Sequence, residues 1–374
     1  MTLLRAGAMV LDGDLARPGW LETSGGRILA CGAGPAPRPA DHDFPDCTVV
    51  PGFVDMHVHG GGGASYTDPT AITTAASFHL RHGTTTTLAS LVTAPPAVLL
   101  AGVRALAGAT HEGTVAGIHL EGPWLSRARC GAHDAAQTRP PEPAEVDAVL
   151  TAGGDAIRMV TLAPELPGAG AAIRRFLDAG VVVAVGHTDA TYEQAERAVT
   201  AGATVATHLF NAMPPLHHRE PGPALALLQD SRVTCELIAD GVHVHPAVLR
   251  AAIRAAGPGR VALVTDAIAA AGCGDGAYTL GAVPIDVESG VARVRGGSTV
   301  AGSTATMAQI FRAAATLAGV PAAARMTAAT PARALGLDRV GHLRAGYDAN
   351  LVALDEDLGV RAVMVRGEWR VATD

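Results

Sequence analysis

Residues 51–60 read PGFVDMHVHG, a buried-strand pattern that ends in a His-x-His pair. Successive side chains point to opposite sides of a strand, so His57 and His59 share one face. Two imidazoles on one face at a strand end can chelate a metal ion, and the alternative is a pair of hydrogen-bonded core histidines. The glycines at 60–63 then form a loop that lets a ligand approach the backbone closely.

More residues of metal-ligand type follow other apolar runs: Glu121 after 115–120, His187 after 181–185, His208 after 205–207 and Asp266 after 261–265. A lone strand-end histidine is more often structural, and a lone aspartate there is often a helix N-cap. As a set, two imidazoles and a carboxylate make a metal site with an open position. Asp266 can then ligate the ion or accept a proton from water.

The same runs predict the fold. Strands are expected near 48–58, 84–93, 115–121, 157–163, 181–187, 203–209, 233–239 and 261–266, the first seven each followed by an Ala-rich helical stretch. This α/β alternation with nearly continuous apolar strands indicates a parallel sheet covered by helices. Eight such units favour a (β/α)8 TIM-type barrel over the alternative, an open doubly wound sheet. Ligand-type residues at successive strand ends fit a barrel that holds a metal at one rim.

The two ends of the chain read differently from the middle. Residues 1–47 and 338–374 contain short alternating runs broken by Gly and Pro, which are typical of β-hairpins. We predict that they form one discontinuous β-sandwich domain beside a catalytic barrel over 48–337. A β-hairpin is expected within the barrel domain near 275–296, followed by helices over 307–318 and 321–329 that close the barrel.

Composition excludes several classes of function. The chain has 374 residues, a net charge of −7 and no basic tract, so neither nucleic acid nor a membrane is an expected partner. Its five cysteines form no C-x-x-C pair and its first residues are not a secretory signal, which favours a cytoplasmic protein with reduced thiols. All 28 basic residues are Arg. The absence of Lys rules out a Schiff-base lysine, a P-loop lysine and a carboxylated lysine that bridges two metals.

Seven strings carry a resemblance: PGFVDMHVHG, HLEGP, GHTDA, THLFNAM, REPG, ADGVH and VTDAI, in this order. They resemble the N-acetylglucosamine-6-phosphate deacetylase family of the amidohydrolase superfamily, over essentially the whole chain. The resemblance implies hydrolysis of an acetamido group to glucosamine 6-phosphate and acetate. It implies Glu121, His187 and His208 as ligands of the principal divalent metal and Asp266 as the catalytic acid and base.

The resemblance also implies one or two metals per subunit, because family members vary at the first strand and this chain keeps His57 and His59. Zinc is expected, and iron, manganese or cobalt also suit the donors. The implied substrate, a phosphorylated acetamido sugar, would contact Ala132, His133, Asn211, Ala212, Arg219, His243, Val300, Ala301 and Gly302. Arg219 and His243 would meet its phosphate, and the family is typically homodimeric.

Other functions stay open at this point. The sugar could be the C4 epimer, N-acetylgalactosamine 6-phosphate, since the contacts that read C4 are not evident from the sequence. A deaminase of the same superfamily would release ammonia instead of acetate. The non-enzymatic alternative is a metal-binding scaffold on the same fold, against which the intact set of ligands and Asp266 argue. Cyclic-amide hydrolases are disfavoured because many of them need a carboxylated lysine.

Overall fold

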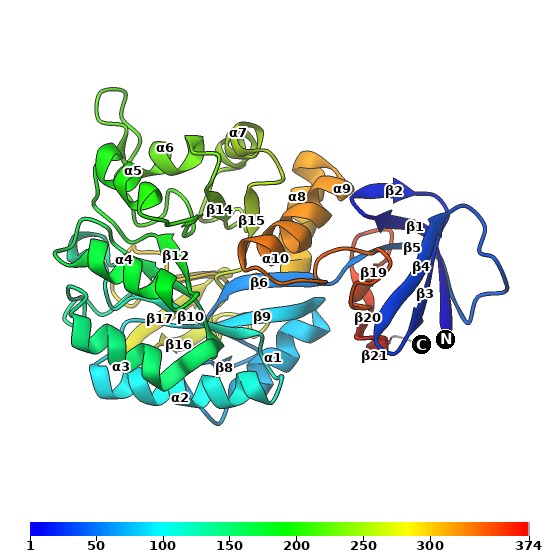
Figure 1. The fold of residues 1–374 in the computed structure, drawn as a ribbon, viewed down its shortest axis with the longest axis horizontal. Helices are drawn as coiled ribbons and strands as arrows, with labels where there is room; N and C mark the ends of the chain where they lie inside the picture. Colours follow the sequence, from blue (N-terminus) through cyan, green and yellow to red (C-terminus); the bar gives the residue numbers. More distant parts are fainter. Residues whose placement is uncertain (373–374) are drawn as a thin grey trace.

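The structure, a computed structural model, describes residues 1–372 and consists of a barrel and a smaller terminal sheet (Figure 1). The first and last strands of the chain, β1 (Thr2–Leu11) and β21 (Glu368–Ala372), lie together in the terminal sheet at the right of the view, and the helices surround the barrel at the left. No helix in the described residues is long and apolar enough to cross a membrane.

The barrel is a sheet of eight parallel strands in the order β15-β14-β13-β12-β11-β10-β9-β6, which confirms the predicted TIM-type fold. Its strands are β6 (Phe53–Val58), β9 (Thr84–Leu91), β10 (Gly117–Glu121), β11 (Ile157–Leu162), β12 (Val182–Val185), β13 (Val205–Ala206), β14 (Thr234–Leu237) and β15 (Val261–Leu263). The covering helices are α1 (Ile72–Arg81), α2 (Pro96–His111), α3 (Pro143–Gly153), α4 (Ala169–Asp178), α5 (Tyr192–Thr200), α6 (Gly222–Gln229) and α7 (Pro246–Ala256).

The barrel interior has an apolar floor. Met56 of β6 and Met159 of β11 meet there with Val264, which follows β15, and Leu335 packs in the same cluster just after helix α10 (Thr330–Ala334). A larger apolar cluster lies between the strands and the surrounding helices. The ligand-type side chains lie above this floor, at the carboxyl ends of the strands.

The barrel closes at a seam where its first and last strands meet without a regular ladder. Backbone bonds join the two sides: Asp266 donates to the carbonyl of His57 over 2.9 Å, and His59 donates to that of Ala267 over 2.8 Å. The Asp55 carboxyl adds a side-chain link, because it accepts from the backbone N–H of Thr265 at 3.2 Å and from its hydroxyl at 2.5 Å. The seam thus lies directly beneath the ligand-type residues.

The terminal sheet has eight strands from both ends of the chain, mostly antiparallel: β1 (Thr2–Leu11), β2 (Asp14–Ala16), β3 (Gly19–Ser24), β4 (Arg27–Ala33), β5 (His42–Pro51), β19 (Leu351–Leu354), β20 (Val360–Val365) and β21 (Glu368–Ala372). Leu4, Leu21, Leu351 and Met364 share its core. The predicted barrel strand over 48–58 is therefore divided, because Thr48–Pro51 pair with β19. The break falls at Gly52, where an added Cβ would lie 2.2 Å from Thr85 Oγ1. The predicted domain limits themselves stay a prediction.

The expected hairpin is a three-stranded sheet of β16 (Gly276–Leu280), β17 (Val283–Glu288) and β18 (Val291–Val294). After it, α8 (Met307–Ala318) begins at a capping box between Thr306 and Gln309. The second predicted helix is α9 (Val320–Ala324), a π-helical turn over Arg325–Ala329 and then α10. A short hairpin of β7 (Gly60–Gly61) and β8 (Ala64–Ser65) follows the His-x-His strand.

Candidate metal centre and active site

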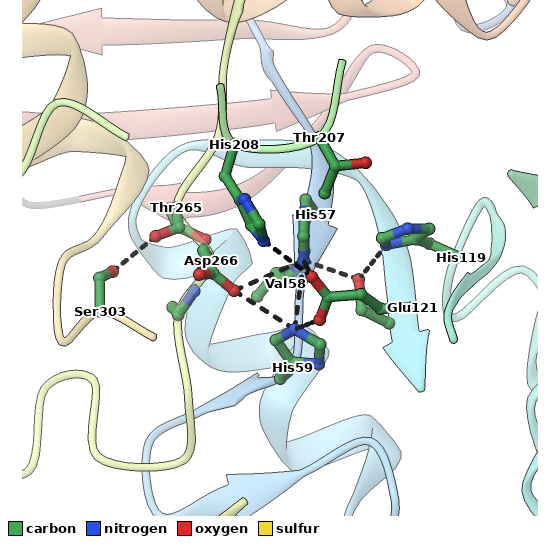
Figure 2. A network of polar contacts seen from close by, with 12 residues as sticks. His57, Val58, His59, His119, Glu121, Thr207, His208, Thr265, Asp266 and Ser303 are labelled. Carbon is green, nitrogen blue, oxygen red and sulfur yellow. Dashed lines mark hydrogen bonds and ion pairs between the residues drawn. The ribbon is translucent and has the colours of Figure 1, made fainter. Parts of the chain in front are cut away.

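Glu121, the last residue of β10, lies at the centre of a buried cluster of histidines (Figure 2). Its Oε1 lies 3.0 Å from the Nε2 atoms of both His187 and His208, and these two nitrogens are 3.0 Å apart. Three ligand-type atoms therefore surround one point, each supplied by the end of a different barrel strand. These are the residues expected to hold the principal metal.

A second group shares the other side of the Glu121 carboxylate. His59 Nε2 lies 3.1 Å from Glu121 Oε2 and 3.3 Å from Asp266 Oδ1, and His57 Nε2 lies 3.2 Å from His59 Nε2. His57, His59 and Asp266 are together close enough to hold an ion. Glu121 thus touches both groups, as a bridging ligand would.

The backbone turns sharply at these strand ends. His187, His208 and Asp266 have left-handed backbone, with φ of 47°, 26° and 48°. This region is unfavourable for residues other than glycine, and such strain is concentrated at functional sites. The surrounding contacts hold each residue in the conformation that directs its side chain into the cluster.

The chemistry of the donors fits a divalent metal ion. Nitrogen and oxygen ligands about 2.0–2.1 Å from a tetrahedral ion lie roughly 3.3 Å from each other, and the donor atoms here lie 3.0–3.5 Å apart. The electrostatics of the cluster also favour a bound cation. Burial works against a charged imidazole, but the carboxylates of Glu121, Glu236 and Asp266 outweigh it and raise the pKa of His57 well above its usual value. Such an excess of negative charge favours a cation.

The remaining imidazole of the cluster, His133, differs from the others in its tautomer. Its Nδ1 accepts the backbone N–H of Thr93 at 3.2 Å, so in the neutral ring the proton lies on Nε2, which donates to Glu121 Oε2 at 3.1 Å. Burial lowers the pKa of His133 to about 4, although Glu121 acts in the opposite direction. His133 is near enough to be counted with Glu121 and His187 as a metal group, but an Nε2–H cannot ligate. The geometry favours His208 as the third ligand.

Asp266 is buried beside two histidines, and its carboxylate can serve as a base. Burial raises its pKa, but the charges of His57 and His59 and the hydrogen bond from His59 outweigh that effect and leave the pKa below its usual range. The side chain is therefore ionised at neutral pH. It also lines the cavity above the cluster, where a substrate would lie.

That cavity has a volume of about 470 Å³, within the range of about 300–1,000 Å³ typical of small-molecule sites. Its lining includes most of the predicted substrate contacts: Ala132, His133, Asn211, Ala212, His243, Val300 and Gly302. Ala301 is fully buried and packs in the core of the inserted hairpin instead. Arg219 is also absent from the lining, because it lies on the exposed stretch 215–220, where its guanidinium contacts His218.

His243 is one of the ionisable side chains that line the cavity. Its Nδ1 lies 2.7 Å from Asp240 Oδ2. Burial lowers the pKa of His243, but the hydrogen bond and charge of Asp240 outweigh this effect and raise it above the usual value. A positively charged imidazole facing the cavity suits an anionic group of a ligand.

Two buried carboxyl groups near the cluster were not among the predicted site residues. Asp55 links the two sides of the barrel seam, and Glu236 accepts hydrogen bonds from His57 and His208. Signals for both exist in the sequence. Asp55 precedes His57 by two residues and so shares its face, and Glu236 interrupts an apolar run as Glu121 does.

The chain is similar to known proteins along its full length. The model of the amidohydrolase family matches residues 48–370. The N-acetylglucosamine-6-phosphate deacetylase of Bos taurus is 40% identical, with 99% of this chain and 94% of that protein covered. The N-acetylgalactosamine-6-phosphate deacetylase of Escherichia coli O157:H7 is 39% identical over 95% of this chain and 96% of its own.

Solved structures agree with these relatives. An N-acetyl-D-glucosamine-6-phosphate deacetylase from Mycobacterium smegmatis, an aspartate-to-alanine mutant in complex with N-acetyl-D-glucosamine-6-phosphate, is 53% identical with a TM-score of 0.97, and 100% of this chain and 99% of that one are covered. The Thermotoga maritima N-acetylglucosamine-6-phosphate deacetylase is 31% identical with a TM-score of 0.90, covering 98% of each chain. The chain therefore belongs to the amidohydrolase family and, within it, to the N-acetylglucosamine-6-phosphate deacetylases.

Proposed function

We propose that the chain hydrolyses the acetamido group of N-acetylglucosamine 6-phosphate to glucosamine 6-phosphate and acetate. The observation that carries this proposal is the convergence of two ligand groups on Glu121 at the base of a cavity that also presents Asp266 and His133. The Mycobacterium smegmatis neighbour in complex with that sugar phosphate supports the choice of substrate.

Glu121, His187 and His208 are proposed to hold the principal metal ion. His57 and His59 would hold a second, with Asp266 beside them and Glu121 between the two. Zinc is the proposed metal, since the donors are imidazole and carboxylate. When bound, a divalent ion would act as a Lewis acid towards water and the acetyl carbonyl.

The chain's own residues would then carry the proton transfers. Asp266, ionised at neutral pH, accepts a proton from the attacking water as its oxygen bonds to the acetyl carbon. The Nε2–H of His133 donates a hydrogen bond to the carbonyl oxygen, where negative charge develops, and keeps its proton throughout. Asp266 next returns the proton to the sugar nitrogen as the C–N bond breaks. The acetic acid that forms loses its proton to solvent as acetate, the free amine leaves and Asp266 is again a carboxylate, so one carboxyl serves as base and then as acid.

Recognition of the phosphate is assigned to His243 and Arg219. The raised pKa of His243 favours a charged imidazole at the cavity wall, which supports this role. Arg219 does not line the cavity of its own chain. It would reach a phosphate there after a movement of the stretch 215–220, or it would reach into the cavity of a second subunit.

The remaining proposed contacts are Ala132, Asn211, Ala212 and the segment Val300–Gly302. We also propose a homodimer that works in the cytoplasm. Light scattering coupled to size-exclusion chromatography tests the oligomeric state, and a monomer at micromolar concentration would contradict it.

An acetate-release assay over a panel of sugars tests the function. The panel holds N-acetylglucosamine 6-phosphate, its galactosamine epimer and both unphosphorylated sugars, and metal content is measured on the same sample. We expect the highest kcat/KM for N-acetylglucosamine 6-phosphate. Preference for the galactosamine epimer would correct the substrate, and ammonia in place of acetate would indicate a deaminase. No turnover with zinc, iron, manganese or cobalt supplied would contradict an enzymatic function.

A further inference from the structure

Glu236 is a buried carboxylate for which the proposed mechanism has no use. It lies on β14 and is fully buried. Its neighbours Cys235 and Leu237 pack in the core between strands and helices, so Glu236 faces the barrel interior. A carboxylate in such a place is unfavourable unless hydrogen bonds compensate for the loss of water. Its contacts therefore indicate what it does.

One oxygen of Glu236 joins the two ligand groups. Its Oε2 lies 3.0 Å from His57 Nδ1 and accepts the backbone N–H of His208, also at 3.0 Å. His57 belongs to the group with His59 and Asp266, while His208 belongs to the group around Glu121. A single atom thus fixes the side chain of one group and the strand end that carries the other.

The contact with His57 also determines which ring nitrogen is free. A carboxylate can only accept, so His57 carries its proton on Nδ1 and presents the lone pair of Nε2 to the cluster. That Nε2 lies 3.2 Å from His59 Nε2 and 3.3 Å from Glu121 Oε1. A carboxylate on the far nitrogen orients an imidazole ligand and makes it a stronger donor.

The other cluster histidines lack such a partner. His187 Nδ1 lies 2.8 Å from the carbonyl oxygen of Arg129, a neutral acceptor. Within residues 1–372, the Nδ1 atoms of His59 and His208 have no hydrogen-bond partner. Among these four rings, His57 is therefore the one whose Nδ1 meets a carboxylate, and the effect of Glu236 falls on the second group.

We propose that Glu236 is a positioning residue that gives the chain its capacity for a second metal ion, by holding His57 in the tautomer and orientation that ligation requires. The proposal rests on the proposed metal-dependent function and deepens it. The principal ion depends less on Glu236, because only the backbone of His208, and no ligand ring of that group, contacts it.

Two substitutions separate charge from hydrogen bonding. In Glu236→Gln the amide oxygen can still accept from His57 and His208, and the amide N–H2 falls where Oε1 lies, which has no partner among the described residues. Glu236→Leu removes the acceptor altogether. Glu165→Gln is the matched control, because Glu165 accepts from Thr188 and Asp189 near the same rim but touches no ligand ring.

The test is zinc binding to chelator-treated protein, measured by calorimetry and by metal analysis after equilibrium dialysis at fixed free zinc. We expect two ions per wild-type and Glu165→Gln chain. The second ion should bind about 10-fold more weakly to Glu236→Gln and about 100-fold more weakly to Glu236→Leu. His57→Asn should reproduce the Glu236→Leu result, with the first ion retained in every variant.

Wild-type affinity for the second ion in Glu236→Gln and Glu236→Leu would overturn the proposal, and so would a single ion in the wild-type chain. Circular dichroism of the metal-free proteins checks folding, and Glu236→Gln alone decides the question if Glu236→Leu fails to fold. The proposed function can fail separately: a wild-type chain that binds two ions, loses the second on substitution of Glu236 and releases no acetate would contradict the function alone.

Discussion

Replacing Asp55 with alanine should weaken the barrel at the seam between its first and last strands. The carboxyl group of Asp55 is fully buried and accepts both donors of Thr265, the backbone N–H at 3.2 Å and the hydroxyl at 2.5 Å. It also lies 3.4 Å from the backbone N–H of His57. No regular ladder joins β6 to β15 in the described sheet, so this side chain replaces part of the missing pairing.

The expected magnitude follows from the groups left behind. Alanine offers no acceptor, and the two donors of Thr265 stay in a region that water does not reach. Each unsatisfied buried donor costs about 1–3 kcal/mol, so the free energy of unfolding should fall by about 2–6 kcal/mol. At roughly 2 °C per kcal/mol for a large domain, the Tm should fall by about 4–12 °C. Asp55→Asn keeps the volume and one acceptor, and should lose less.

Calorimetric unfolding of Asp55→Ala, Thr265→Val and the double variant forms a cycle that isolates the link. If the two side chains stabilise the protein by contacting each other, the double variant should lose less free energy of unfolding than the sum of the two single variants, by at least about 1 kcal/mol. A loss below about 1 kcal/mol in Asp55→Ala, or strict additivity in the cycle, would refute the reasoning about the seam.

The remaining predictions concern the site. Asp266→Asn should lower kcat by about 10²–10⁴-fold while the principal metal stays bound, and near-normal turnover would refute its role as base. His133→Gln should lower kcat by about 10²–10³-fold with unchanged zinc content, because its Nε2 carries a proton; a loss of zinc would show that it ligates. Asp240 raises the pKa of His243, so kcat/KM for the phosphorylated substrate should fall as pH rises through that pKa. Asp240→Asn should shift this fall to lower pH. Identical pH profiles for the wild-type protein and Asp240→Asn would count against a phosphate contact. Arg219→Ala should raise KM for the phosphorylated sugar about 10–100-fold and spare the unphosphorylated one, whereas equal effects on both would remove the assignment.

Much of the site is predictable from the sequence because the fold itself brings the strand-end residues together. In a parallel barrel, the carboxyl ends of all strands meet at one rim, so residues that follow apolar runs become neighbours whatever their separation. Glu121, His187 and His208 satisfy this rule: Glu121 ends its strand and the two histidines follow theirs, and each strand is evident from its apolar residues. Predicting which residues form the cluster then requires only that the strands be recognised in the sequence.

Features that depend on contacts between distant segments are not predictable in the same way. The division at Gly52 arises because Thr48–Pro51 pair with β19, some three hundred residues further along the chain; Pro51 and Gly52 mark a break in the run, but nothing in the sequence shows which distant strand the first part joins. The position of Arg219 is of the same kind. Its residue type suits a phosphate, but only the path of the exposed stretch 215–220 decides whether it reaches the cavity.

Glu121 and Glu236 have the same sequence pattern, so the sequence alone does not tell a metal ligand from a residue that positions one. Both are carboxylates inside apolar runs, and both face the barrel interior. Glu121 is the last residue of its strand and lines the cavity, whereas Glu236 lies one residue before the end of β14 and contacts the histidines from the side away from the cavity. The two carboxylates also meet different atoms of the imidazole rings. Glu121 lies against Nε2 atoms, where it can share a metal ion with them, and Glu236 lies against Nδ1 of His57, where it makes Nε2 of that ring a better ligand.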